Sequence, residues 1–300
     1  MAPMEPTPLD ITLEAINYVA EDGQTFDGFQ LTSERTTLEG QKTGIVFLHG
    51  LRGSALSGGI AAVAHALARK GAYCLTVNKR NSGKLYERSI FDEIDRDIHG
   101  AVAFLRDRGC DEIILWGRSL AATEVAYYQG TRKDADVTAV VLAAPFADIR
   151  ERTTRSYFDA VSDDAAAAYE SFVENARSLV ESGRGTELVA LPRPVGGTVE
   201  YIPMTATSFL SYRAPESACS TIEWTPHIDV PILLLPHDSE DKRMVEEANE
   251  IALTATQSSV VEIHPIEADH FFTGAEREVA ARTADFVVRL RSNQRRRFPD

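Results

Sequence analysis

The sequence of 300 residues predicts an α/β protein with a mostly parallel central sheet, helices on both faces of the sheet and a mainly helical cap insertion. Short apolar runs alternate with helix-compatible segments in both halves of the chain, which is typical of a parallel sheet covered by helices. Between residues 149 and 228 the alternation stops, which indicates an insertion. The predicted organisation is therefore a core in two parts, 1–148 and 229–300, with a cap or lid at 149–228.

The predicted core elements of the first half follow one another closely. The apolar run from Gly44 to Gly50 suits a strand buried on both faces, and apolar residues at helical spacing between Ser89 and Arg108 indicate a helix. Ser89, with Asp92 three residues later, resembles a capping box for that helix. In chain order we expect two strands within 11–33, a strand at 44–50, a helix at 60–69, a strand at 72–77, a helix at 89–108, a strand ending at 116, a helix at 121–129 and a strand at 137–144.

The second half contains the cap and the end of the core. Within the cap, Asp163 to Val180 predicts a helix, residues 183–197 are interrupted by glycine and proline, and Tyr201 to Tyr212 carries aromatic side chains. The basic and polar tail 291–300 is expected to be frayed surface. The core elements expected here are strands at 230–235 and 260–263 and a helix at 275–290.

The composition limits the partners and the compartment. The formal net charge of −14 argues against nucleic acid or an anionic membrane as the main partner, because both attract basic surfaces. No apolar run approaches a membrane span, and no signal segment is evident. The three cysteines show neither a disulfide framework nor a zinc pattern. We therefore expect a cytoplasmic protein with no metal and no cofactor that acts on a small molecule, and we leave homo-oligomerisation open.

A glycine-x-serine-x-alanine motif, Gly117 to Ala121, stands between an apolar run and a helix-compatible segment. This pattern is typical of a nucleophile elbow, in which a strand turns sharply into a helix and exposes one serine. The residues two before and two after the serine must be small, because strand and helix crowd together there. Ser119 would stand at the N-terminus of the helix, where free N–H groups favour negative charge.

An acidic loop and a histidine follow two later strands. Asp238, Glu240 and Asp241 come after the strand that ends at Leu235, and His270 comes after the last predicted strand. Because ligands bind at the carboxyl ends of parallel strands, these side chains are expected at the same edge as Ser119. The sequence therefore presents serine, acid and histidine in that chain order.

These motifs resemble those of the α/β-hydrolase superfamily, from about Gly44 to Leu290 with the cap excluded. The matching segments are Phe47-Leu48-His49-Gly50-Leu51, Gly117-Arg118-Ser119-Leu120-Ala121, His237-x-x-x-Asp241-x-x-Met244 and Ala268-Asp269-His270-Phe271-Phe272. The resemblance implies a nucleophilic Ser119, a base His270 and an acid that orients the base.

The resemblance also bears on the acid and the oxyanion hole. The family pattern aligns Asp241 as the acid, although Asp238 stands where glycine is usual; Glu240 and Asp148 remain alternatives. The oxyanion hole would consist of the backbone N–H groups of Leu51 and Leu120.

The implied activity is hydrolysis of a carboxylic ester or related acyl bond through an acyl-serine intermediate, and the cap favours a small or medium organic substrate over a polymer. One alternative keeps the triad but cleaves an amide or peptide, a thioester or a C–C bond. Another is a non-catalytic ligand-binding protein with this fold, which the intact serine, acid and histidine argue against.

Several further side chains are candidates for substrate contacts. Arg118 and Arg52 have guanidinium groups that suit a carboxylate or carbonyl. Tyr201, Phe209 and Tyr212 are candidates to line a pocket under the cap, and a hydrophobic cap core explains them equally well. His49 is expected to have a structural role in the oxyanion turn.

Overall fold

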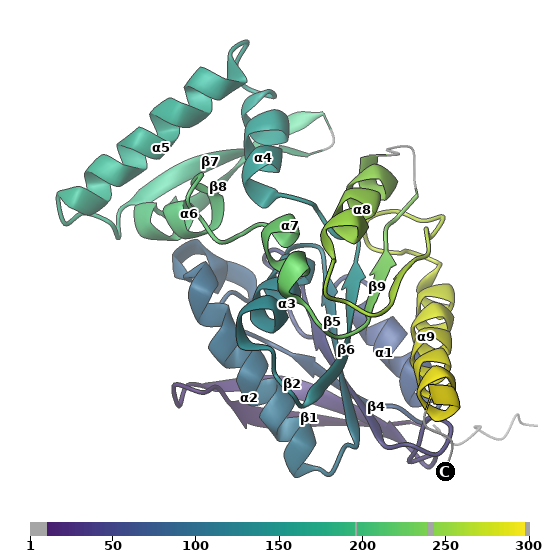
Figure 1. Ribbon diagram of the computed structural model, residues 1–300. Coiled ribbons are helices and arrows are strands. Elements are labelled where there is room, and N and C mark those ends of the chain that lie inside the picture. Colours follow the sequence, from purple (N-terminus) through teal and green to yellow (C-terminus); the bar gives the residue numbers. More distant parts are fainter. Residues whose placement is uncertain (1–10, 196, 239–242, 298–300) are drawn as a thin grey trace, which may run out of the picture.

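The computed structural model describes residues 11–195, 197–238 and 243–297. The core of the fold is an eight-stranded sheet (Figure 1). The strand order is β1-β2-β4-β3-β5-β6-β9-β10. The first two strands form an antiparallel hairpin at one edge, β2 is antiparallel to β4, and the pairs from β4 to β10 are parallel. The strands are β1 (Ile11–Val19), β2 (Thr25–Ser33), β3 (Thr43–Leu48), β4 (Tyr73–Val77), β5 (Glu112–Arg118), β6 (Val137–Ala143), β9 (Ile232–Leu235) and β10 (Val261–Ile263).

Helices cover both faces of this sheet, as the alternation of apolar segments predicts. The core helices are α1 (Ile60–Ala68), α2 (Ile94–Asp107), α3 (Leu120–Arg132), α8 (Arg243–Thr254) and α9 (Glu276–Arg297). Strand β3 shows why both faces need covering: Val46 and Leu48 pack with α2 and α3, whereas Ile45 and Phe47 pack with α1 and α9. None of the helices in the described part of the chain is long and apolar enough to cross a bilayer.

The segment between β6 and β9 forms a separate layer over the carboxyl ends of the strands (Figure 1). Its elements are α4 (Ile149–Arg152), a π-helical turn η3 (Thr153–Phe158), α5 (Ala165–Glu181), β7 (Leu188–Val195), β8 (Thr198–Thr205) and α6 (Ala206–Arg213). After them, α7 (Thr221–Trp224) and a 3₁₀ turn η4 (Thr225–His227) pack against the core helices α3 and α8. The layer has its own apolar cluster, which also takes in Tyr86 and Phe91 from the short 3₁₀ turns η1 (Gly83–Arg88) and η2 (Phe91–Glu93).

The hairpin β7–β8 was not expected from the sequence, because prolines argue against a strand. Pro192 and Pro194 lie in β7, opposite Tyr201 and Val199 of β8. Residues two apart in a strand direct their N–H groups to the same side. In a two-stranded hairpin one side of each strand is a free edge. Two prolines that both face this edge remove no hydrogen bond between the strands.

Two local expectations are wrong. Ser89 does not cap a helix: its hydroxyl donates to Tyr86 O, and α2 begins only at Ile94, after the 3₁₀ turn η2. The tail after Leu290 is not frayed at its start, because α9 continues to Arg297 and Arg291 is buried. Its guanidinium provides ion-pair and backbone contacts that the basic composition alone does not reveal.

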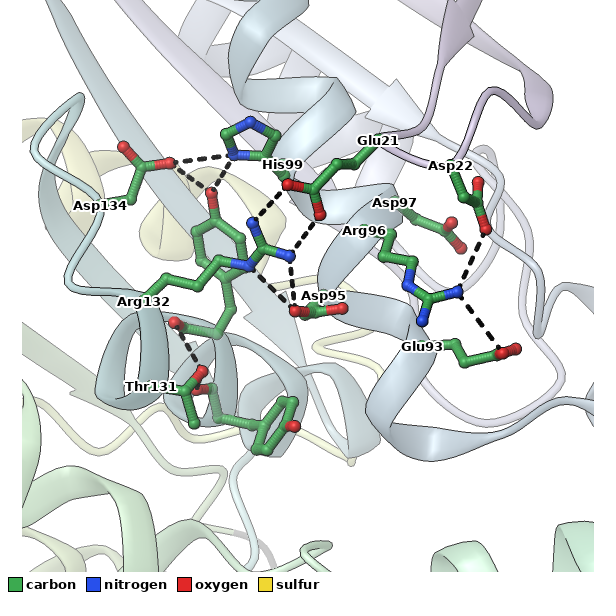
Figure 2. A network of polar contacts seen from close by, with 12 residues as sticks. Glu21, Asp22, Glu93, Asp95, Arg96, Asp97, His99, Thr131, Arg132 and Asp134 are labelled. Atoms are coloured by element: carbon green, nitrogen blue, oxygen red, sulfur yellow. Dashed lines mark hydrogen bonds and ion pairs between the residues drawn. The ribbon is translucent and has the colours of Figure 1, made fainter.

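A polar network ties the β1–β2 turn to the helices on one face (Figure 2). Arg132 at the end of α3 binds the carboxylates of Glu21 and Asp95, and Arg96 of α2 pairs with Asp22 and Glu93. Most of these side chains are partly exposed, so each pair contributes little stability by itself. Their effect is to fix the hairpin edge of the sheet against α2 and α3.

We expect Arg291→Met to lower the free energy of unfolding by about 3 kcal/mol, because it leaves a partly buried carboxylate without its partner. Arg291 Nε lies 2.9 Å from Glu112 Oε1, and its Nη atoms donate to Leu38 O and Thr43 Oγ1. Arg289→Met is the matched control: its more exposed pair with Glu262 should contribute about 0–1 kcal/mol. Urea unfolding of both variants measures this, and equal losses would contradict the structural role of Arg291.

Candidate active site

Ser119 occupies a strained turn between β5 and α3. Its backbone has φ 60° and ψ −123°, a conformation that residues other than glycine rarely adopt. Its N–H donates to Ala143 O at 2.8 Å, which anchors the turn to the neighbouring strand. A Cβ atom at Gly117 would lie 2.2 Å from Ala121 O, and one at Gly50 would lie 2.9 Å from Ser119 Cβ. The crowding therefore explains why the sequence has glycine at both positions.

The structure brings His270 to Ser119 across 151 residues of sequence. His270 lies in the loop after β10, and its Nε2 atom is 2.9 Å from Ser119 Oγ. The ring stacks on Phe146, with centroids 5.4 Å apart, and lies at 79° to the His237 ring, with centroids 5.2 Å apart. This arrangement holds the imidazole beside the serine hydroxyl at hydrogen-bond distance.

The surroundings of His270 favour the neutral imidazole. Burial, with smaller contributions from His237, Arg118 and Arg152, lowers the pKa of His270 to about 3, while Asp269 opposes the shift. A neutral ring can accept a proton from the serine hydroxyl.

The choice of Asp241 as the acid stays a prediction, and the structure bears only on the alternative Asp148. Asp241 and Glu240 lie outside the described residues. Asp148 caps α4 and forms an ion pair with Arg150. Although burial raises the pKa of Asp148, the hydrogen bonds and charge of Arg150 bring it below its ordinary value. The carboxylate of Asp148 is thus engaged within the cap segment, contrary to a role beside His270.

Leu51 and Leu120 are the residues whose backbone N–H groups are predicted to form the oxyanion hole. Leu120 is the first residue of α3, where N–H groups have no partner within the helix, and Leu51 follows the strand β3. Both residues line the same cavity as Ser119 and His270. No acceptor for either N–H is found within the described part of the chain.

His49 has the structural role expected for it. The ring is fully buried, with Nδ1 2.9 Å from Gly50 O and Nε2 2.6 Å from Ser82 Oγ. Burial lowers the pKa of His49 well below its ordinary value, so the ring is neutral at pH 7. It fixes the turn that carries Leu51.

A cavity of about 280 Å³ opens onto Ser119 and His270 between the core and the cap layer. Arg118, one of the predicted substrate contacts, lines it. The other four candidates do not: Phe209 and Tyr212 are buried in the cap's own apolar cluster, Tyr201 is 62% exposed on β8, and Arg52 pairs with Glu87. The cap side of the cavity is instead formed by Ile149, Arg152, Ser156, Tyr157, Arg193, Pro194 and Arg213.

The cap arginines were missed because no motif surrounds them. Arg152, Arg193 and Arg213 lie on three different elements, α4, β7 and α6, and only the fold brings them together. Within the described residues, no group of three or more His, Cys, Asp or Glu side chains is arranged to hold a metal ion.

The comparisons with known proteins rest on structure alone. No protein family model matches the sequence, and no curated protein matches it. The esterase Pf2001 from Pyrococcus furiosus is 16% identical in sequence and superposes with a TM-score of 0.61. The alignment covers 96% of this chain and 95% of the esterase. The α/β hydrolase GrgF from Penicillium sp. sh18 is 15% identical over 93% and 98% of the two chains, with a TM-score of 0.67. A carboxyl esterase from Bacillus coagulans is 11% identical over 92% and 98%, with a TM-score of 0.66. Together with the eight-stranded sheet and the turn at Ser119, these similarities show that the chain has the α/β-hydrolase fold.

Proposed function

We propose that the protein is a serine hydrolase that cleaves a carboxylic ester or related acyl bond of a small or medium organic substrate. The observation that carries this proposal is the 2.9 Å approach of His270 Nε2 to Ser119 Oγ inside a cavity that is also lined by Leu51 and Leu120. The esterases among the structures of similar fold support the same bond type. In this proposal residues 149–228 act as the cap, the protein is cytoplasmic, and no cofactor takes part.

The first half of the reaction forms an acyl-enzyme. Ser119 is a weak nucleophile as an alcohol, so His270 removes its proton as Oγ attacks the substrate carbonyl. The resulting oxyanion accepts hydrogen bonds from Leu51 N–H and Leu120 N–H; removing one such donor typically lowers kcat about 10²–10³-fold. The tetrahedral intermediate then collapses, and His270 gives the proton to the departing alcohol oxygen.

The second half releases the acid. A water molecule, deprotonated by His270, attacks the acyl-Ser119 carbonyl through the same oxyanion site, and the proton returns to Ser119 Oγ. A carboxylate that accepts a hydrogen bond from Nδ1–H of His270 keeps Nε2 as the proton acceptor and stabilises the imidazolium. We assign this role to Asp241, with Glu240 as the alternative in the same loop.

The small cavity and the cap above it favour a compact substrate. A volume of about 280 Å³ lies near the lower end of pockets that enclose small molecules. An extended polymer would have to displace cap residues such as Tyr157 and Arg193 before its carbonyl reached Ser119.

Ser119→Ala should lower kcat about 10⁵–10⁶-fold with an unchanged fold, because it removes only the nucleophilic oxygen. A fluorophosphonate probe, followed by peptide mapping, should modify wild-type Ser119 stoichiometrically. Labelling should be lost in Ser119→Ala and in His270→Ala but retained in the exposed control His65→Ala. Equal labelling of the Ser119→Ala variant would contradict the proposal. A folded wild-type protein that is not labelled would also contradict it.

Asp241→Asn should lower kcat about 10⁴-fold, because an amide favours the wrong imidazole tautomer. Glu240→Gln should have a far smaller effect, and Asp148→Asn should reduce thermal stability more than kcat, since Asp148 caps α4. Steady-state kinetics and melting temperatures of the three variants measure this. The reverse ranking of Asp241 and Glu240 would transfer the role to Glu240.

The rate should persist into mildly acidic solution. Burial and neighbouring positive charges lower the pKa of His270 from 6.5 to about 3, so the imidazole stays neutral, and able to accept a proton, as the pH falls through 6.5. The Asp241 carboxylate proposed on Nδ1–H favours the imidazolium and opposes part of this shift. We therefore expect kcat/KM for a non-titrating ester to decline with an apparent pKa below 6.5, with return to pH 8 as the control for unfolding. A decline centred at or above 6.5 in the folded enzyme would contradict this pKa shift.

A further inference from the structure

The cavity beside Ser119 is cationic, in contrast to the protein as a whole. The chain has 45 acidic against 31 basic residues, yet the cavity is lined by Arg118, Arg152, Arg193 and Arg213. No aspartate or glutamate is found among its lining residues in the part of the chain that the structure describes. Chance would favour acidic over basic side chains in this protein, so the concentration of arginine calls for a physical explanation.

Arg213 on α6 is the most deeply buried of the four. It is 2% exposed, and its Nη atoms lie 3.0 Å from Thr153 Oγ1 and 3.2 Å from Tyr86 OH. Both partners are neutral, and its Nε atom has no hydrogen-bond partner within the described residues. Burying a cation without an anion is unfavourable. An anionic ligand in the cavity would provide the missing countercharge.

Arg118, next to the nucleophile, is also a buried arginine with few hydrogen bonds. It is 4% exposed, its only hydrogen bond within the described residues is a long one to His270 O at 3.4 Å, and its Nε atom is without a partner there. Burial lowers the pKa of Arg118 to about 10, with Asp269 opposing the shift, so the guanidinium still carries its charge at pH 7. Its guanidinium carbon stands 4.8 Å from the centre of the Phe271 ring.

The other two arginines extend the positive surface onto the cap. Arg193 of β7 is half-buried and forms no ion pair with any described residue. Arg152 of α4 lies over the Phe146 ring at 3.9 Å, and Phe146 in turn stacks on His270. Three cap elements and the nucleophile turn therefore each contribute one guanidinium to a single cavity.

We propose that the substrate carries an anionic group, a carboxylate or a phosphate, in addition to its ester, and that Arg213, Arg193 and Arg118 bind that group. This inference rests on the proposed ester hydrolysis and names its substrate class. Guanidinium groups bind carboxylate and phosphate oxygens through paired N–H donors, which a neutral group cannot replace. A bound anion also offsets the positive charges that oppose protonation of His270.

Matched ester pairs that differ only by a terminal anion test the proposal. Methyl hexanoate is compared with monomethyl adipate for an anion on the acyl side. Butyl acetate is compared with 4-acetoxybutanoate and with 3-acetoxypropyl phosphate for a carboxylate or phosphate on the alcohol side. We expect at least one anionic ester to have a kcat/KM about 10–100-fold above its neutral counterpart. The pair that shows it identifies the anion and the side of the ester to which it belongs.

Variants show whether the arginines cause the preference. Arg193→Gln, at a half-buried position without an ion pair, should lower the anionic-to-neutral ratio of kcat/KM at least several-fold, and Arg213→Met should lower it more. Arg184→Gln, an exposed arginine on the cap that pairs with Glu187, is the control and should keep the ratio. If Arg213→Met does not fold, Arg193→Gln decides alone.

Different results would contradict the anionic substrate class and the proposed ester hydrolysis itself. If Ser119 is labelled by the fluorophosphonate but every neutral ester is cleaved at least as well as its anionic counterpart, the anionic substrate class is wrong and ester hydrolysis stands. An unchanged ratio in Arg193→Gln would likewise overturn the assignment of the arginines. If Ser119 is not labelled and no ester of either kind is cleaved, the proposed hydrolysis itself fails.

Discussion

The buried ion pair between Lys79 and Glu124 joins the parts of the molecule on which the site depends. Both side chains are fully buried, and Lys79 also donates to His49 O at 3.1 Å. Glu124 belongs to α3, the helix that begins at Leu120, while His49 leads into Leu51. Asn81 donates to Glu124 at 2.7 Å and to Tyr212 OH of the cap at 3.3 Å. One polar cluster thereby connects the segment that leads into Leu51, the helix that begins at Leu120 and the cap.

Such a cluster is needed because the turn at Ser119 is strained. A residue held at φ 60° and ψ −123° costs about 1–3 kcal/mol relative to relaxed backbone. The hydrogen bond from Ser119 N to Ala143 O and the close approach of Ala121 to Gly117 help to hold the turn in this conformation. The pair of Lys79 and Glu124 links α3, which follows this turn, to His49 after the neighbouring strand, and so helps to hold the strained geometry in place.

The sequence predicts the core far better than the cap, for a physical reason. Strands and helices that pack on a sheet show regular apolar spacing, and side chains such as Ser119 and His270 are placed by their position after a strand. The cap has a small apolar cluster of its own, so its aromatic residues do not reveal whether they face the cluster or the cavity. Phe209 and Tyr212 belong to that cluster, which is one of the two interpretations that the sequence left open, and no sequence motif indicated Arg213. Asp241 stays a prediction, because it lies outside the described residues.

The charge of the cavity connects substrate recognition with the chemical step. The overall charge of −14 does not attract anions from a distance, so the arginines can act only at short range, where burial strengthens their interactions. Arg118, one of the groups that would bind an anion, lowers the pKa of His270, and so does Arg152 in the same cavity. An anion bound among them would stabilise the imidazolium that forms as Ser119 attacks, and it would do so more than it stabilises the neutral ground state. Because only such differential stabilisation accelerates a reaction, the contribution of the anion should appear in kcat as well as in KM.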